Sequence, residues 1–192
     1  MSQGPISWTQ TLEYLREDKI VFKRFYQDWA GYEPRWCLTY PSYLCVVLYR
    51  ISHFFYMRGQ RVFARLFWHI NLLLNGIDIA PITQIGPGLF VAHPCGTVLV
   101  GKIGRNCFLH GQNGVGGGRS NEDIGAGPGL PVLGDDLEFG FGAFILGSFR
   151  VGDRVKIGPR CFVSSAVEDD TEIQSVRPIV RAGKAEVNHD AG

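Results

Sequence analysis

From Ile77 onward the sequence repeats every six residues, and this period limits the possible folds more than any other feature. Thirteen positions spaced by six fall into two runs, and twelve of them are apolar. Glycine directly follows seven of the thirteen, although only 25 of the 192 residues are glycine. The first run is Ile79, Ile85, Val91, Thr97, Ile103, Leu109 and Val115, and the second is Leu133, Phe139, Ile145, Val151, Ile157 and Val163.

A six-residue unit corresponds to one short strand and one corner, with its apolar residue pointing inward. Glycine suits a corner where a Cβ would be crowded or where φ must be positive. Three units make a triangular turn of about 18 residues, and stacked turns form three parallel sheets around an apolar column. The two runs therefore predict a parallel β-helix of about four turns.

The residues before the repeat have helical spacing of their apolar side chains instead. Ser7 is a suitable N-cap for a helix over residues 8–26, and a loop with glycine and two prolines follows it. Two further helices are expected, one over 43–58 and one over 61–75, each ended by a glycine.

Two segments depart from the regular coil. Residues 116–132 are rich in glycine and polar side chains, which predicts a long loop, and such excursions usually carry function. A strand over 173–180 is expected to fold back on the coil. The predicted organisation is an N-terminal helical domain (1–76), a β-helix domain (77–180) that includes the loop 116–132, and a flexible C-terminal tail (181–192).

Composition narrows the function. The formal net charge is only +1, which argues against nucleic acid as a partner. The five cysteines contain no CxxC pair, so neither a metal site nor a disulfide framework is expected, and reduced thiols favour a cytoplasmic protein. No basic segment followed by an apolar stretch, as in a secretory signal, is visible at the N-terminus.

The helices expected over 43–58 and 61–75 are apolar but are interrupted by arginines, so neither is long enough to span a membrane. Two alternatives remain for their apolar surface. It is buried against partner subunits, or it gives peripheral contact with the inner face of the membrane through an arginine-edged surface.

One stretch of the sequence resembles the serine O-acetyltransferase branch of the hexapeptide-repeat acyltransferases, which includes capsule and polysaccharide O-acetyltransferases. The pattern GxDIxPxxxIGxGLxxxHxxGxV carries the resemblance, and it is much more specific than a single hexad. Its residues here are Gly76, Asp78, Ile79, Pro81, Ile85, Gly86, Gly88, Leu89, His93, Gly96 and Val98. The resemblance implies a left-handed β-helix and acetyl transfer from acetyl-CoA, the co-substrate, to a hydroxyl.

His93 matches the catalytic histidine of the family, and Asp78 matches the carboxylate that orients it. An alcohol needs a general base as it attacks a thioester, and a carboxylate on one ring nitrogen fixes the imidazole tautomer. Fifteen residues separate the two, close to one turn of the coil. Without the surrounding motif, both residues could serve the corner and the cap of an ordinary coil.

The resemblance also implies where acetyl-CoA binds. Main-chain groups of glycines and a lysine that meets a CoA phosphate form the donor site in the family. The matching residues here are Gly116, Gly117, Gly140, Phe141, Gly142, Lys156 and Pro159. Proline at 159 and phenylalanine at 141 are unusual for the family and suggest a reshaped groove.

The acceptor side departs from the family pattern. Ala92 stands where an acidic residue usually precedes the catalytic histidine, Ala80 replaces a histidine, and Leu130 stands where an arginine is usual. Without these polar groups a serine zwitterion loses charge-assisted contacts, so a saccharide hydroxyl is the expected acceptor. Ala92, Leu130 and His110, which lies near the loop, are the predicted acceptor contacts.

Two alternatives stay open beside the saccharide acetyltransferase. One is a serine O-acetyltransferase with an altered acceptor site, and the other is a structural β-helix without catalysis. A homotrimer is expected by resemblance and because open coils expose strand edges and apolar faces, with a possible dimer of trimers through the helices. Cys95, Cys107 and Cys161 share one place in the hexad, which predicts that all three are packed inside.

Overall fold

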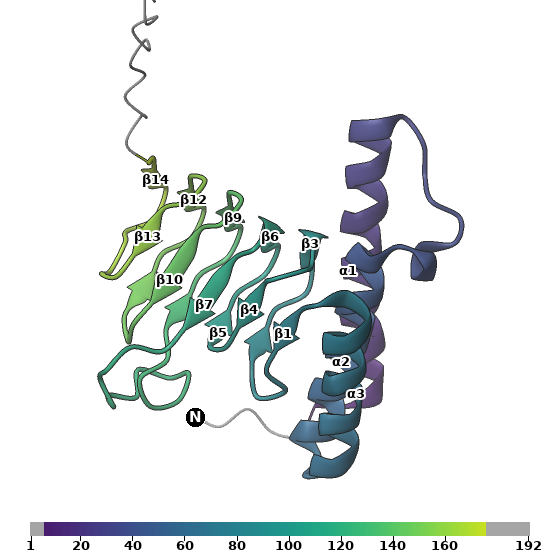
Figure 1. Ribbon diagram of the computed structural model, residues 1–192, viewed down its shortest axis with the longest axis horizontal. Coiled ribbons are helices and arrows are strands. Elements are labelled where there is room, and N and C mark those ends of the chain that lie inside the picture. Colours follow the sequence, from purple (N-terminus) through teal and green to yellow (C-terminus); the bar gives the residue numbers. More distant parts are fainter. Residues whose placement is uncertain (1–5, 176–192) are drawn as a thin grey trace, which may run out of the picture.

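The computed structural model of the protein describes residues 6–175. In Figure 1, three helices stand at one end of a coil of short strands that extends away from them. The helices are α1 (Trp8–Ala30), α2 (Pro41–Met57) and α3 (Arg61–Asn75), with a short 3-10 helix, η1 (Cys37–Thr39), before α2. The predicted architecture, a helical layer followed by a parallel β-helix, is confirmed.

The helix ends follow local chemistry. The Ser7 hydroxyl accepts a hydrogen bond from the Gln10 N–H at 3.0 Å and caps α1 as predicted. Gly31 and Gly76 end α1 and α3 in the left-handed conformation, with φ of 72° and 64°. Two expectations were wrong: α1 continues beyond residue 26 to Ala30, and α2 begins at Pro41, whose missing N–H suits the first helical turn, rather than after Ser42.

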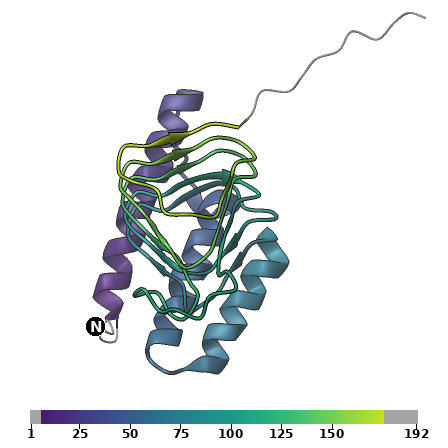
Figure 2. The ribbon, with the colours of Figure 1, turned by 90° about the vertical axis from the view of Figure 1, so that its left-hand side faces the viewer.

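The coil has three parallel sheets, here called A, B and C, with β1 and β3 next to the helices. Figure 2, turned by 90°, shows the turns as nested triangles. Sheet A contains β1 (Asp78–Ile79), β4 (Val98–Leu99), β7 (Gly114–Gly116), β10 (Phe144–Leu146) and β13 (Phe162–Val163). Sheet B contains β2 (Gln84–Ile85), β5 (Lys102–Ile103), β8 (Val132–Leu133) and β11 (Arg150–Val151). Sheet C contains β3 (Phe90–His93), β6 (Phe108–Gly111), β9 (Glu138–Phe139), β12 (Lys156–Ile157) and β14 (Glu172–Ile173).

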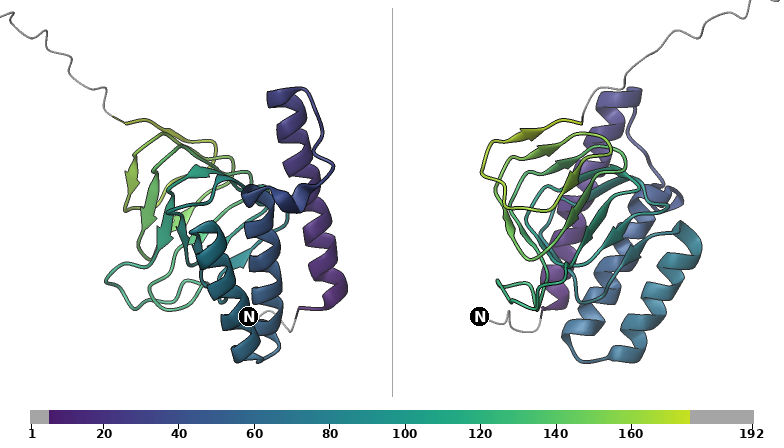
Figure 3. Two further views of the ribbon diagram at one scale, coloured as in Figure 1. Left: turned by 45° about the vertical axis from the view of Figure 1, so that its right-hand side comes forward. Right: turned by 60° about the vertical axis from the view of Figure 1, so that its left-hand side comes forward.

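The interior of the coil is formed by the residues that the six-residue period marks. All thirteen, Thr97 included, are at most 5% exposed. One side of α2 closes the column next to the helices, because Cys45, Val46 and Tyr49 belong to the same buried cluster. Figure 3 shows α2 and α3 as an antiparallel pair beside the first strands. The helices therefore cap the coil as well as precede it.

The glycines after the marked residues are needed because a side chain has no room there, not because φ is positive. Gly86 and Gly104 lie one turn apart on the corner between sheets B and C, and neither has a positive φ. A Cβ on Gly86 would lie 2.7 Å from the main-chain carbon and oxygen of Gly104. Successive turns touch backbone to backbone at this corner, so a side chain has no room.

Three further expectations need correction. The coil has about five turns rather than four, and β14 adds a strand parallel to β12. Residues 176–180 of the strand that was expected to fold back lie outside the described residues. Arg50 is buried and therefore does not edge an exposed helical surface. Cys95 is exposed, unlike Cys107 and Cys161.

No helix within residues 6–175 is long and apolar enough to cross a membrane. The predicted tail, 181–192, lies outside the described residues.

Candidate active site

His93 is the last residue of β3, at the corner where the chain passes from sheet C to sheet A. Its side chain is exposed, whereas Val91, two residues earlier, is inside the column. The next turn places Gly111 directly beside it, where a Cβ would lie 2.8 Å from the His93 Cβ and carbonyl oxygen. The imidazole thus lies outside the coil, as a catalytic role requires.

Later turns continue the same corner through residues 140–143 and 158–161. The Phe141 ring meets the His93 ring edge-on, with 6.4 Å between the ring centroids. The Gly142 N–H donates to the Gly111 carbonyl at 2.9 Å, and the Gly140 N–H donates to the Ile157 carbonyl at 2.7 Å. Pro159 is exposed on the following turn. The structure therefore brings Gly140, Phe141, Gly142 and Pro159 to the His93 corner, with the two glycine N–H groups already engaged.

Asn113 holds this corner together and was not singled out from the sequence. It is fully buried, and its Nδ2 donates to the Gly140 carbonyl at 2.7 Å. Its Oδ1 accepts from the Gly111 N–H at 2.9 Å, and its own N–H donates to the Thr97 hydroxyl at 3.3 Å. The sequence indicated a polar contact here only through Thr97, which is the one polar residue among the thirteen marked positions. A buried amide that serves two turns fixes their stacking.

A hollow of about 420 Å³ adjoins His93 on the side of the helices. Its lining contains hydroxyl, amide and thiol groups but no acidic, lysine or arginine side chain among the described residues. Ala92, a predicted acceptor contact, lies in this lining. The lining residues are Tyr26, Pro41, Ser42, Leu74, Asn75, Ala92, His93, Pro94 and Cys95.

Asp78 lies on sheet A, and its Oδ1 accepts a hydrogen bond from the Trp68 Nε1–H of α3 at 2.8 Å. Within residues 6–175 of one chain it forms no hydrogen bond with His93. The segment just before it does lie against the His93 corner, because the Gly96 N–H donates to the Gly76 carbonyl at 2.9 Å. Asp78 therefore lies at the edge of the His93 corner, and its side chain is hydrogen-bonded to Trp68 of α3.

Three predicted residues lie at a different corner of the coil. Gly116 ends β7, at the corner between sheets A and B, and Gly117 begins the long loop. Leu130 is near the end of that loop, and a Cβ on Gly117 would lie 3.4 Å from its Cδ2. The loop contacts the next turn of the coil, since the Ser148 hydroxyl donates to the Glu122 carbonyl at 2.9 Å. In one chain, sheet A separates these residues from His93.

The two remaining predicted residues lie on the outer side of sheet C. Lys156 is exposed on β12 between Glu138 and Glu172 of the neighbouring strands. His110 is on β6, with its Nε2 3.2 Å from a Glu138 carboxylate oxygen. His110 thus faces away from the long loop. No cluster of metal-ligating side chains occurs in the described part of the chain.

Comparison with known proteins identifies the family of the chain, although no family model matches. A relative from Synechococcus elongatus, named serine acetyltransferase, is 30% identical over 169 residues, which is 86% of this chain and 67% of the relative. A Bacillus pumilus protein of the same name is 32% identical over 157 residues, 80% of this chain and 70% of its own. The chain belongs to the serine acetyltransferase family.

A solved structure supports the family assignment. The crystal structure of Neisseria gonorrhoeae serine acetyltransferase in complex with serine matches with a TM-score of 0.76 and 27% identity, over 88% of this chain and 69% of that one. Membership identifies the chain as a hexapeptide-repeat acyltransferase and argues against the purely structural alternative. The chain spans about two thirds of the length of these relatives.

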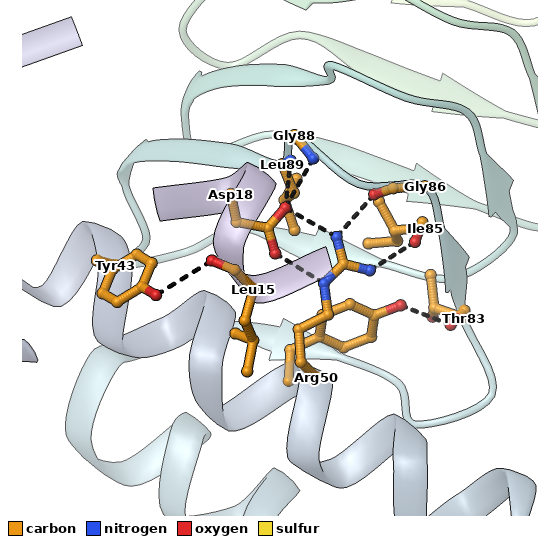
Figure 4. A network of polar contacts seen from close by, with 10 residues as sticks. Leu15, Asp18, Tyr43, Arg50, Thr83, Ile85, Gly86, Gly88 and Leu89 are labelled. Carbon is orange, nitrogen blue, oxygen red and sulfur yellow. Dashed lines mark hydrogen bonds and ion pairs between the residues drawn. The ribbon is translucent and has the colours of Figure 1, made fainter. Parts of the chain in front are cut away.

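A buried ion pair fixes the helices of this family member against the coil (Figure 4). The Arg50 Nε and Nη2 of α2 donate to the two carboxylate oxygens of Asp18 on α1, at 2.9 and 3.0 Å. Arg50 also donates to the carbonyls of Ile85 and Gly86, at 2.6 and 2.7 Å. The pKa of Arg50 is raised overall, because the Asp18 carboxylate outweighs the effect of burial.

The same network reaches the corner between β2 and β3 in the first turn of the coil. The main-chain N–H groups of Gly88 and Leu89 donate to Asp18 Oδ1, both at 2.8 Å. Both oxygens of the buried Asp18 carboxylate therefore accept hydrogen bonds, which offsets the cost of its burial. This clamp positions α1 and α2, which supply Tyr26 and Ser42 to the hollow beside His93.

Proposed function

We propose that the protein transfers the acetyl group of acetyl-CoA to the hydroxyl of serine, with His93 as the general base. The observation that carries this proposal is family membership over most of the chain, together with an exposed His93 at a corner that adjoins a hollow. The saccharide acceptor expected from the sequence has less support, because the relatives are named serine acetyltransferases.

His93 would act in two proton transfers. Its unprotonated ring nitrogen takes the hydroxyl proton as the serine oxygen attacks the thioester carbonyl carbon. The carbon–sulfur bond then breaks, and the imidazolium returns the proton to the CoA sulfur. The products are an O-acetyl ester and free CoA. The exposed ring lies outside the coil, where both substrates can reach it.

Asp78 is proposed as the positioning residue for His93. Its Oδ1 is held by Trp68, while Oδ2 forms no hydrogen bond within residues 6–175. A carboxylate fixed on one oxygen and open on the other can accept from a ring N–H and stabilise the imidazolium.

A homotrimer would bring the two halves of the donor site together. Gly116, Gly117 and Leu130 are separated from the His93 corner by sheet A, so one chain alone does not unite them. The outer side of sheet A carries four exposed apolar residues, Val98, Phe144, Leu146 and Phe162. At the equivalent positions of sheets B and C, the exposed residues are all charged: Arg150, Glu138, Lys156 and Glu172. Sheet A is therefore the side on which neighbouring copies would pack.

In this arrangement the acetyl-CoA site contains groups from two copies. Phe141, Gly142 and Pro159 line one wall beside His93, and Gly116 and Gly117 of a neighbouring copy line the other. Lys156 supplies a point charge for a CoA phosphate on the outer side of sheet C. A dimer of trimers through the helices and a cytoplasmic location belong to the same proposal.

A neutral acceptor is the second candidate, because the hollow beside His93 lacks ionic side chains among the described residues. Ala80, Ala92 and Leu130 offer nothing to an ammonium or a carboxylate. Hydroxyl and amide groups such as Tyr26, Ser42 and Asn75 suit a saccharide hydroxyl instead.

The test is release of free CoA from acetyl-CoA with serine, simple sugars or oligosaccharides as acceptor. Turnover that depends on serine supports the first candidate, and turnover with only a saccharide supports the second. His93→Ala is expected to lower kcat by about two to four orders of magnitude with the fold intact. His69→Gln is the control, because His69 is an exposed residue of α3. Equal turnover in His93→Ala and the wild type would reject the mechanism.

A further inference from the structure

A second hollow, of about 490 Å³, lies between the first half of α1 and sheet B, away from the His93 corner. Gln10 and Tyr14 of α1, His53 of α2, and Gln84 and Lys102 of sheet B line it. Its volume is in the range of small-molecule sites. None of the residues proposed for acetyl transfer contributes to it.

The charge of this hollow is positive. Its described lining contains Lys102 and Arg105 and no acidic side chain. Arg105 is paired with Glu17 at 2.7 Å, which neutralises it in part. Lys102 forms no ion pair or side-chain hydrogen bond within residues 6–175, so its ammonium is the available charge for a ligand.

The lining of the hollow includes His53, whose ring has one nitrogen without a hydrogen-bond partner among the described residues. His53 is only 6% exposed, and its Nδ1 lies 2.9 Å from the Pro81 carbonyl. Because a carbonyl only accepts, Nδ1 carries the hydrogen and Nε2 is left as an acceptor. Within residues 6–175 Nε2 has no partner, so a hydroxyl donor on a ligand would satisfy it.

The backbone of the same wall does not compete for an anion. The carbonyls of Ile85 and Gly86, which border the hollow, already accept from Arg50 at 2.6 and 2.7 Å. The side-chain amide of Gln84 adds a donor beside Lys102. The wall therefore offers an ammonium and an amide to an oxyanion, and the Nε2 acceptor of the largely buried His53 ring to a hydroxyl.

We propose that this hollow binds a small molecule through a hydrogen-phosphate group, with its oxygens on Lys102 and Gln84 and its hydroxyl on His53 Nε2. Hydrogen phosphate combines charge with a hydroxyl donor, whereas sulfate supplies only acceptors at neutral pH. The site does not depend on the proposed acetyl transfer. Inorganic phosphate is the simplest probe of it.

The experiment is calorimetric titration of the full chain with inorganic phosphate at pH 7 and constant ionic strength. Saturable binding at one site per chain is expected, with sulfate at least about fivefold weaker because it cannot donate to His53. Lys102→Met should weaken phosphate binding about tenfold, the loss of one charge-assisted contact. Gln84→Leu should weaken it about threefold, the loss of a neutral hydrogen bond.

Two lysine variants serve as matched controls. Lys19→Met removes an exposed charge from α1 outside the hollow, and Lys156→Met removes the charge assigned to the donor groove; both should bind phosphate like the wild type. Circular dichroism checks that every variant is folded. The proposal is overturned if the wild type shows no saturable binding. It is also overturned if sulfate binds as tightly as phosphate, or if Lys156→Met loses binding while Lys102→Met retains it.

Discussion

Replacing Arg50 by methionine removes the guanidinium that joins α1, α2 and the first turn of the coil. The Arg50 and Asp18 side chains are 2% and 0% exposed, so water cannot replace the lost partner. The variant leaves a buried carboxylate with only the N–H groups of Gly88 and Leu89, and the carbonyls of Ile85 and Gly86 lose a donor. Breaking one side of a buried pair is strongly destabilising for this reason.

The expected loss is about 3–5 kcal/mol in the free energy of unfolding. For a chain of this length each kcal/mol shifts the melting temperature by about 2–4 °C, so Tm should fall by roughly 6–20 °C. Adding Asp18→Asn should recover about 1–2 kcal/mol, because it removes the unpaired charge and keeps an oxygen for Gly88 and Leu89.

Urea denaturation of the two single variants and the double variant measures these values. Arg105→Met is the matched control, since the Arg105–Glu17 pair also joins α1 to the coil but is exposed, and it should cost at most about 1 kcal/mol. The reasoning fails if Arg50→Met costs no more than Arg105→Met, or if adding Asp18→Asn destabilises the chain further.

Three other perturbations test the remaining parts of the structure. Burial lowers the pKa of His53 below its ordinary value, so the unfolded chain binds the proton first and the free energy of unfolding should fall as pH drops below about 6.5. Urea titrations in phosphate-free buffer should show a flatter pH dependence of this free energy for His53→Gln, and the same pH dependence in variant and wild type would contradict the reasoning. Gly104→Ala places a Cβ 2.6 Å from the main-chain carbon of Gly134 and should lower the free energy of unfolding by about 2–3 kcal/mol. Gly59→Ala, where φ is positive but space is open, should lower it by about 1 kcal/mol, and equal losses of stability in thermal melts would argue against backbone contact at Gly104. Phe162→Glu charges the apolar side of sheet A and should convert the proposed trimer to monomers in sedimentation velocity; a trimer that persists in the variant would contradict the proposed packing.

The column was predictable because its pattern is local. Each inward position lies six residues from the next, so the burial of Thr97 and Phe139 follows from counting alone. The helix end at Gly76 is equally local, since it depends on one residue that tolerates the left-handed conformation. The end of α1 at Gly31 and the start of α2 at Pro41 are local as well, but both were placed wrongly from the sequence.

The contacts between helices and coil correspond to no such repeating pattern in the sequence. Asp18 and Arg50 are 32 residues apart, and their other partners are main-chain groups near Gly88, so neither residue type nor spacing indicates the pair. Cys95 was misplaced for a related reason. The end of α3, rather than another turn, lies beneath its corner, and Gly76 offers no side chain to cover it. His93 is exposed at a corner of the coil, but its catalytic role stays a prediction, and its proposed partners depend on surfaces that a single sequence does not pair.

The three corners of the column differ in how much change they tolerate. Between sheets B and C, glycine main chains touch from turn to turn, and an inserted residue would separate every layer above it. Between sheets A and B the chain already departs for residues 117–131 and returns in register at Val132. The length and sequence of that one excursion can therefore change while the strands that position His93 keep their register.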